Sequence, residues 1–131
     1  MVIPEEYLTT VFLLPGGLQR LPESFAMITA WNPMDHGKSR EENQRADEAL
    51  RRSLELRQLP YIRITGCSPD LSHREPGWGV PMGKEDALKL AKRFNQRAIW
   101  WVEGDDLSLV GCSGGGEMRV DSFRSRIRPL P

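Results

Sequence analysis

The sequence has few of the residues that build disulfide frameworks, metal knuckles or nucleophilic active sites. Cys67 and Cys112 are the only cysteines in its 131 residues, and His36 and His73 are the only histidines. No pair of these side chains has the close spacing of metal ligands. The sequence also lacks a nucleophile elbow, and Gly114–Gly116 is not followed by the Gly-Lys-Ser/Thr ending of a phosphate loop. We therefore expect no metal and no cofactor.

Long apolar runs and an excess of one charge are also missing. No apolar stretch approaches the roughly 20 residues that span a bilayer, and the first ten residues, MVIPEEYLTT, lack the pattern of a signal peptide. The full sequence has 18 basic and 18 acidic residues. It therefore has no excess of positive charge that would attract nucleic acid or a membrane surface. We expect a cytoplasmic protein with no membrane partner, and the composition argues against nucleic acid as a partner.

The hydrophobic pattern predicts one small domain over residues 1–131. Its core covers about residues 7–112, and a Gly-rich, Arg-bearing tail follows at 113–131. Apolar and β-branched runs predict about five strands, at residues 9–14, 25–31, 61–67, 98–102 and 107–112. Periodic apolar positions predict two main helices, which open at Ser39 and Gly83.

The order β-β-α-β-α-β-β favours an α+β fold. We expect a mixed, mostly antiparallel sheet with the helices packed mainly on one face. The run 25–31 is apolar on both faces, which indicates a central strand. Residues 68–83 contain three prolines and three glycines, which predicts the longest loop, and long loops are often functional. Residues 119–127 form either a last edge strand or loose chain.

The junction between the second strand and the first helix is the first candidate site. Asn32 ends the strand, Ser39 and Glu42 fit a capping box at the helix start, and Asn43 lies on the buried stripe of the helix. Helix N-termini offer free N–H groups and partial positive charge, which suit an anion or a polar ligand. The alternative is that these residues only cap the helix and fix the loop.

The segment EPGWG, residues 75–79, is the second candidate. Trp78 either stacks on a ligand or plugs the core. If the domain is an enzyme, Glu75 is the one carboxylate that we nominate as a general base. The adjacent Trp100 and Trp101 point to opposite faces of their strand. One of them belongs in the core, and the other lies under a helix or on an open face, where it would mark a partner surface.

Three segments together resemble a known family. They are FAMITAWNP, SREENQRADEALRRSL and EPGWGVPMGKEDALKLAKRFNQRAIWW, and they are similar in order and spacing to the bacterial domain-of-unknown-function family 3293. The likeness covers roughly residues 7–112 and rests on Phe25–Pro33, Ser39–Asn43, Glu75–Gly77 and Phe94–Trp100. The chain departs from the family pattern between Cys67 and His73 and in its tail. The resemblance implies a small bacterial protein without an assigned activity, and it adds Gln96 to the candidate site.

Two functional hypotheses follow. The first is a domain that binds a polar or anionic small molecule, such as a nucleotide, at the strand–helix junction. Its candidate ligand-binding residues are Asn32, Ser39, Asn43, Glu75, Trp78 and Gln96. The second is a protein-interaction or regulatory module without catalytic activity, which would use Trp100 or Trp101 and the sheet edge. A ligand site requires Asn32, Asn43 and Glu75 to converge on a concave pocket. Nucleic-acid binding would instead require the tail arginines to form one basic face.

Overall fold

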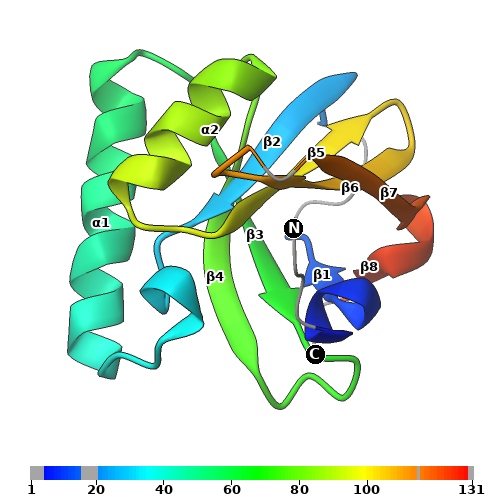
Figure 1. Cartoon of the computed structure of the whole chain (residues 1–131), viewed down its shortest axis with the longest axis horizontal. Helices are drawn as coiled ribbons and strands as arrows, with labels where there is room; N and C mark the ends of the chain where they lie inside the picture. The colour runs from blue at the N-terminus through cyan, green and yellow to red at the C-terminus, as the bar shows by residue number, and fades with distance from the viewer. Residues whose placement is uncertain (1–4, 16–20, 115, 130–131) are drawn as a thin grey trace.

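One eight-stranded sheet, curled into a half-barrel, forms the centre of the protein (Figure 1). The structure is a computed structural model that describes residues 5–15, 21–114 and 116–129. The strands are β1 (Val11–Leu13), β2 (Ser24–Thr29), β3 (Ile62–Cys67), β4 (Arg74–Val80), β5 (Ala98–Glu103), β6 (Asp106–Gly111), β7 (Glu117–Ser122) and β8 (Ile127–Arg128). Across the sheet their order is β7-β6-β5-β2-β4-β3-β1-β8. All neighbours pair antiparallel except β1 and β8, which are parallel.

Two helices cover the outer face of the half-barrel. They are α1 (Arg40–Leu56) and α2 (Lys84–Arg93), and Figure 1 shows both on the same side of the sheet. Leu50 and Leu54 of α1 and Leu90 of α2 are fully buried against that face. This confirms the α+β fold with its helices on one face. No helix in the described ranges is long and apolar enough to cross a membrane.

The prediction of about five strands was wrong, because β4, β7 and β8 extend the sheet to eight. We expected β4 to be loop because Pro76, Gly77 and Gly79 are poor strand formers. It pairs instead with β2 on one side and β3 on the other, and this two-sided pairing outweighs local propensity. A Cβ atom at Gly77 would lie 2.8 Å from the carbonyl oxygen of Ile28, so the position requires glycine.

The second strand is central, as predicted, since β2 lies between β5 and β4. Its side chains alternate between two cores. Ile28 belongs to the outer core, beneath the helices, whereas Phe25 and Met27 belong to the inner core. Of the two alternatives for the tail, an edge strand or loose chain, the structure has strands, namely β7 and β8. Gly115 and residues 130–131 of that tail lie outside the described residues.

Candidate functional site

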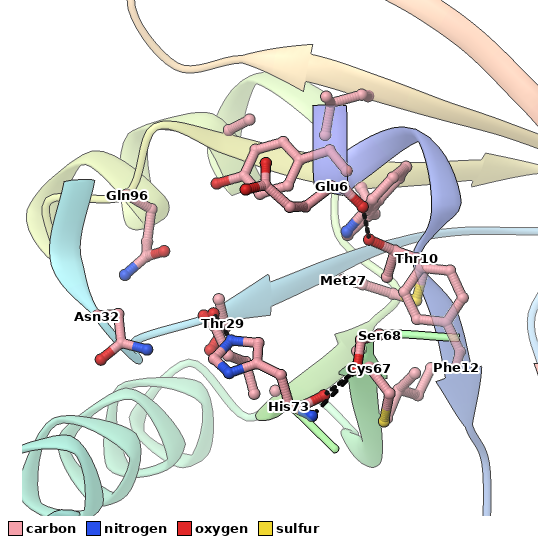
Figure 2. Close-up of a pocket in the computed structure, with 18 of the residues that line it drawn as sticks. Glu6, Thr10, Phe12, Met27, Thr29, Asn32, Cys67, Ser68, His73 and Gln96 are labelled. Carbon is pink, nitrogen blue, oxygen red and sulfur yellow. Dashed lines mark hydrogen bonds and ion pairs between the residues drawn. The ribbon is translucent and has the colours of Figure 1, made fainter. Parts of the chain in front are cut away.

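The inner face of the half-barrel encloses a cavity of about 680 Å³ at one end (Figure 2). Its walls come from the C-terminal ends of β2 and β3 and the N-terminal ends of β4 and β5. The 3-10 turn η1 (Glu5–Thr9) and β1 form the opposite side. Cavities of a few hundred Å³ with mostly apolar walls are typical of small-molecule sites.

Small inward-facing side chains explain why this end is hollow. The inner positions here include Thr29, Gly66, Gly77 and Ala98. At the far end of the same face the side chains are large. Phe25 there packs edge-to-face on Phe123, with ring centroids 5.5 Å apart. Because inner positions alternate along every strand, the change from large to small residues divides the interior into a packed half and an open half.

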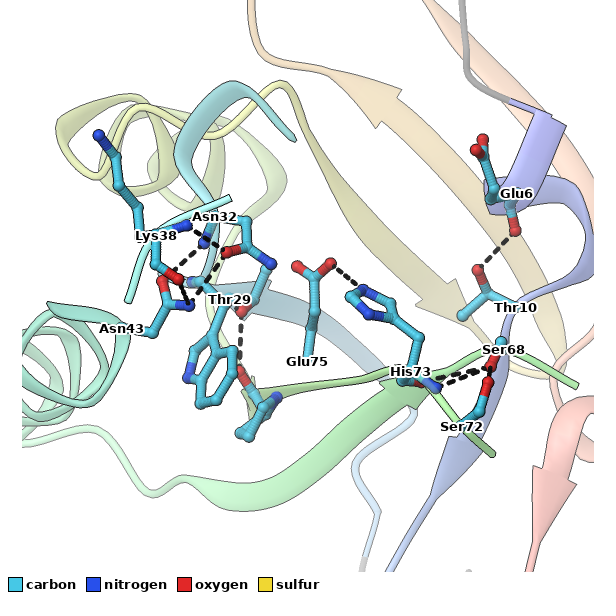
Figure 3. Close-up of polar contacts among 12 residues, drawn as sticks. Glu6, Thr10, Thr29, Asn32, Lys38, Asn43, Ser68, Ser72, His73 and Glu75 are labelled. Atoms are coloured by element: carbon cyan, nitrogen blue, oxygen red, sulfur yellow. Dashed lines mark hydrogen bonds and ion pairs between the residues drawn. The ribbon is translucent and has the colours of Figure 1, made fainter. Parts of the chain in front are cut away.

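Asn32 lies at the mouth of the cavity and is fixed by Asn43 (Figure 3). Its φ of 47° is left-handed, a region that Asn adopts more readily than most residues. The Asn32 N–H donates to Asn43 Oδ1 (2.9 Å), and Asn32 Oδ1 accepts from Asn43 Nδ2 (3.0 Å) and the Lys38 N–H (3.1 Å). The backbone donors identify the oxygen of each amide. Asn32 Nδ2 therefore points into the cavity without a partner among the described residues.

Gln96 is a second oriented amide on the cavity wall, and it is only 8% exposed. Its Nε2 donates to the carbonyl oxygens of Trp31 (3.2 Å) and Phe94 (3.3 Å). Both partners are acceptors, so Oε1 faces away from them toward the cavity, and no described residue donates to it. In the described residues, Gln96 Oε1 is not among the side-chain atoms that are buried without a hydrogen-bond partner, so it is open to the cavity. A ligand that donates a hydrogen bond could bind this acceptor.

His73 and Glu75 form a pair at the mouth of the same cavity. They lie two residues apart where β4 begins, so their side chains share a face. His73 Nε2 lies 2.8 Å from Glu75 Oε2, and the side chains are 63% and 28% exposed. Figure 3 shows Glu75 between His73 and Asn32. Sequence reasoning selected Glu75 but missed His73, although the His-x-Glu spacing in an extended segment was a usable signal.

The cavity wall formed by η1 was not predicted from the sequence. Glu6 and Tyr7 of η1 line the cavity. Arg126 holds η1 in place, because its Nη1 and Nη2 donate to the carbonyl oxygens of Thr10 and Leu8, each at 2.9 Å. The C-terminal region thus positions the N-terminal wall of the cavity through a contact between residues 116 or more positions apart.

Ser39 and Trp78, two of the residues selected from the sequence, lie outside the cavity lining. Ser39 Oγ accepts from the Glu42 N–H (3.1 Å), and Glu42 Oε1 accepts from the Ser39 N–H (3.3 Å), so the predicted capping box is present. These hydrogen bonds lower the pKa of Glu42. Trp78 is 8% exposed on the outer face, where the guanidinium of Arg63 lies 3.7 Å from its ring centre.

The two adjacent tryptophans face opposite sides of β5, as predicted. Trp101 belongs to the outer core, whereas Trp100 lines the cavity beside Phe12, edge-to-face at 5.4 Å between ring centroids. The large apolar side chains that are exposed in the described part of the chain include no aromatic residue. Trp101 is thus buried, whereas Trp100 is only partly buried and faces the cavity.

The remaining reactive side chains do not form a separate centre. Cys67 lines the cavity, but it is buried, and burial raises the pKa of its thiol. Burial raises the pKa of Cys112 to about 11. In the described residues, no group of three or more His, Cys, Asp or Glu side chains could hold a metal ion. In the tail, Arg119 and Arg126 pair with acidic residues of the sheet region.

The family comparison agrees with the resemblance found in the sequence. The family described as "Protein of unknown function (DUF3293)" matches residues 28–99, which is more than half of the chain. The chain belongs to this family. No curated protein and no solved structure matches it. The DUF3293 match includes Asn32, Asn43, Glu75 and Gln96, whereas η1 lies outside the matched range.

Proposed function

We propose that this DUF3293 domain binds a small organic molecule in the cavity on the inner face of its sheet. The main support is a pair of oriented amide atoms, Asn32 Nδ2 and Gln96 Oε1, that have no partner among the described residues and lie beside a mostly apolar space of about 680 Å³. The first group is a donor and the second an acceptor. They would orient a ligand, and the apolar walls would contribute most of the binding free energy.

Asn43 acts in this proposal as a positioning residue. It does not line the cavity, but its two hydrogen bonds to Asn32 set the direction of the Asn32 amide. This gives the strand–helix junction a role in binding that does not depend on the N-terminus of α1. That terminus is already satisfied in part by its own capping box at Ser39.

The charges of the cavity argue against the nucleotide or other anion that the sequence suggested. Glu6 and Glu75 are in the lining, and no described lysine or arginine is. An anion would meet two carboxylates and no guanidinium or ammonium group. A neutral or cationic ligand therefore fits the proposal better. The protein-interaction alternative has less support, because Trp101 is buried and the partly buried Trp100 faces the cavity.

If the ligand is also transformed, the His73–Glu75 pair is the general base that we propose. A carboxylate that holds an imidazole nitrogen orients the ring and stabilises its protonated form. In this arrangement Glu75 would orient His73, and His73 would accept the proton. This revises the sequence-based nomination of Glu75 alone.

A thermal-shift screen with neutral, cationic and anionic fragments tests the binding proposal. Ala98→Leu would place a larger side chain in the cavity, and Ala49→Leu makes the same change at an exposed position of α1. A ligand at 100 times its dissociation constant adds about 2.7 kcal/mol. For 131 residues this corresponds to a rise of about 10 °C in the midpoint.

The proposal predicts a fragment that stabilises the wild type and Ala49→Leu but not Ala98→Leu. If Ala98→Leu responds as strongly as the wild type, the ligand binds elsewhere. If no fragment stabilises any of the three proteins, the proposal is wrong.

A further inference from the structure

The carboxylates of the cavity are incompletely paired. Glu6 has no ion-pair or side-chain hydrogen-bond partner among the described residues. Glu75 engages His73 through Oε2, and no residue in the described ranges donates to its Oε1. A positive charge on a ligand would interact favourably with both carboxylates, and the interaction is stronger beside apolar walls than in bulk water.

Aromatic rings line the cavity beside these acids. Trp100 packs edge-to-face on Phe12 at 5.4 Å and is tilted against Tyr7 at 6.3 Å, both measured between ring centroids. All three rings contribute to the cavity lining. A cation within about 6 Å of a tryptophan or tyrosine face is attracted to the ring. The wall therefore suits either an apolar group or a cation.

Gln96 gives independent support for a ligand that donates hydrogen bonds. Its side chain is more than nine-tenths buried, and its Oε1 is aimed into the cavity without a described donor. The acceptor side of the cavity is thus Gln96 Oε1, Glu75 Oε1 and the Glu6 carboxylate. Asn32 Nδ2 is an amide donor on the lining of the same cavity. A ligand with N–H groups could donate to these three acceptors.

We propose that the ligand is an organic ammonium ion with an apolar or aromatic body. This inference rests on the proposed function. The N–H groups of the ligand donate to Gln96 and to the carboxylates, and its body packs on the wall formed by Trp100 and Phe12. Asn32 Nδ2 donates a hydrogen bond to a second polar atom of the ligand, if the ligand has one.

Three probes that share one body and differ in charge test this inference. They are 2-phenylethylamine, 2-phenylethanol and phenylacetate, titrated at neutral pH into the ¹⁵N-labelled full chain while its amide resonances are followed. The variants are Glu75→Gln and Glu6→Gln, and each removes one cavity carboxylate. Glu41→Gln is the matched control, because it removes one negative charge at an exposed position of α1. The thermal midpoint of each variant shows that it is folded.

The amine is expected to bind wild type and Glu41→Gln at least about tenfold more tightly than the alcohol, a difference of about 1.4 kcal/mol. Glu75→Gln or Glu6→Gln should remove most of this preference, because each weakens binding of the amine more than binding of the alcohol. If the alcohol or phenylacetate binds the cavity as tightly as the amine, the cation inference is wrong, while the proposed function stands. If no probe shifts a cavity resonance up to about 10 mM, both are contradicted.

Discussion

Replacement of Asn43 by alanine tests the role of the strand–helix junction. Asn43 is 3% exposed and makes two good hydrogen bonds to Asn32, at 2.9 and 3.0 Å. Each is worth about 1 kcal/mol net, so Asn43→Ala should destabilise the domain by about 2 kcal/mol. With an unfolding entropy of about 2.1 cal/mol/K per residue and 131 residues, the thermal midpoint should fall by about 7 °C.

The same variant should weaken binding of any ligand that uses Asn32, because the Asn32 amide loses the group that orients it. Ser39→Ala is the control. It removes the cap of α1 at a cost of about 1 kcal/mol, but it leaves the amide pair intact. Calorimetry gives the midpoint of each protein, and titration with a cavity probe gives its affinity. A drop of less than about 2 °C for Asn43→Ala, with unchanged probe affinity, would refute the reasoning.

Three further changes have defined outcomes. Arg126→Ala should release η1, which hydrogen exchange would detect as faster exchange there; unchanged protection would refute the anchoring role. Gly77→Ala brings a Cβ atom to 2.8 Å from the Ile28 carbonyl oxygen and should cost about 1–3 kcal/mol in denaturant unfolding; wild-type stability would show that β4 needs no glycine there. The Ser68 hydrogen bond is the largest cause that lowers the pKa of Asp70 from 3.8 to about 2. The stability that ionised Asp70 contributes is therefore complete above its unfolded pKa and is lost as pH falls toward 2. Asp70→Asn should flatten this dependence of the unfolding free energy on pH, which denaturant titrations at several acidic pH values measure. An unchanged slope would contradict the assignment.

Local signals in the sequence were sufficient for the helices and for most strand positions. The capping box at Ser39 and the buried place of Asn43 on α1 follow from spacing within one element. The opposite directions of Trp100 and Trp101 follow from the period of a strand. In each case the information lies within a few consecutive residues, and the fold does not need to be known.

The strand β4 could not be recognised in this way. Its residues include Pro76, Gly77 and Gly79, whose local preference is for turns. The strand forms because β2 and β3 supply backbone partners on both of its sides. The partner β2 lies far from β4 in the sequence. The register between two distant strands cannot be read from a single short stretch of residues.

The outline of the cavity could not be predicted from the sequence either, because it depends on the curl of the whole sheet. Asn32, Glu75 and Gln96 were selected from the sequence and do line one cavity. Glu6 was not selected for it, because η1 is held at the cavity by contacts with Arg126 and Trp100, which are distant in sequence. Long-range closure of this kind has no local sequence pattern.

Intermolecular nuclear Overhauser effects between bound 2-phenylethylamine and the protein test the central claim most directly. If the inner face of the half-barrel is the binding site, the probe will show contacts to the methyl groups of Thr29 and Ile64 and to the Trp100 ring, all of which line the cavity. Contacts confined to the outer face around Trp78 or to the edge strand β7, with none to the cavity residues, would contradict the account.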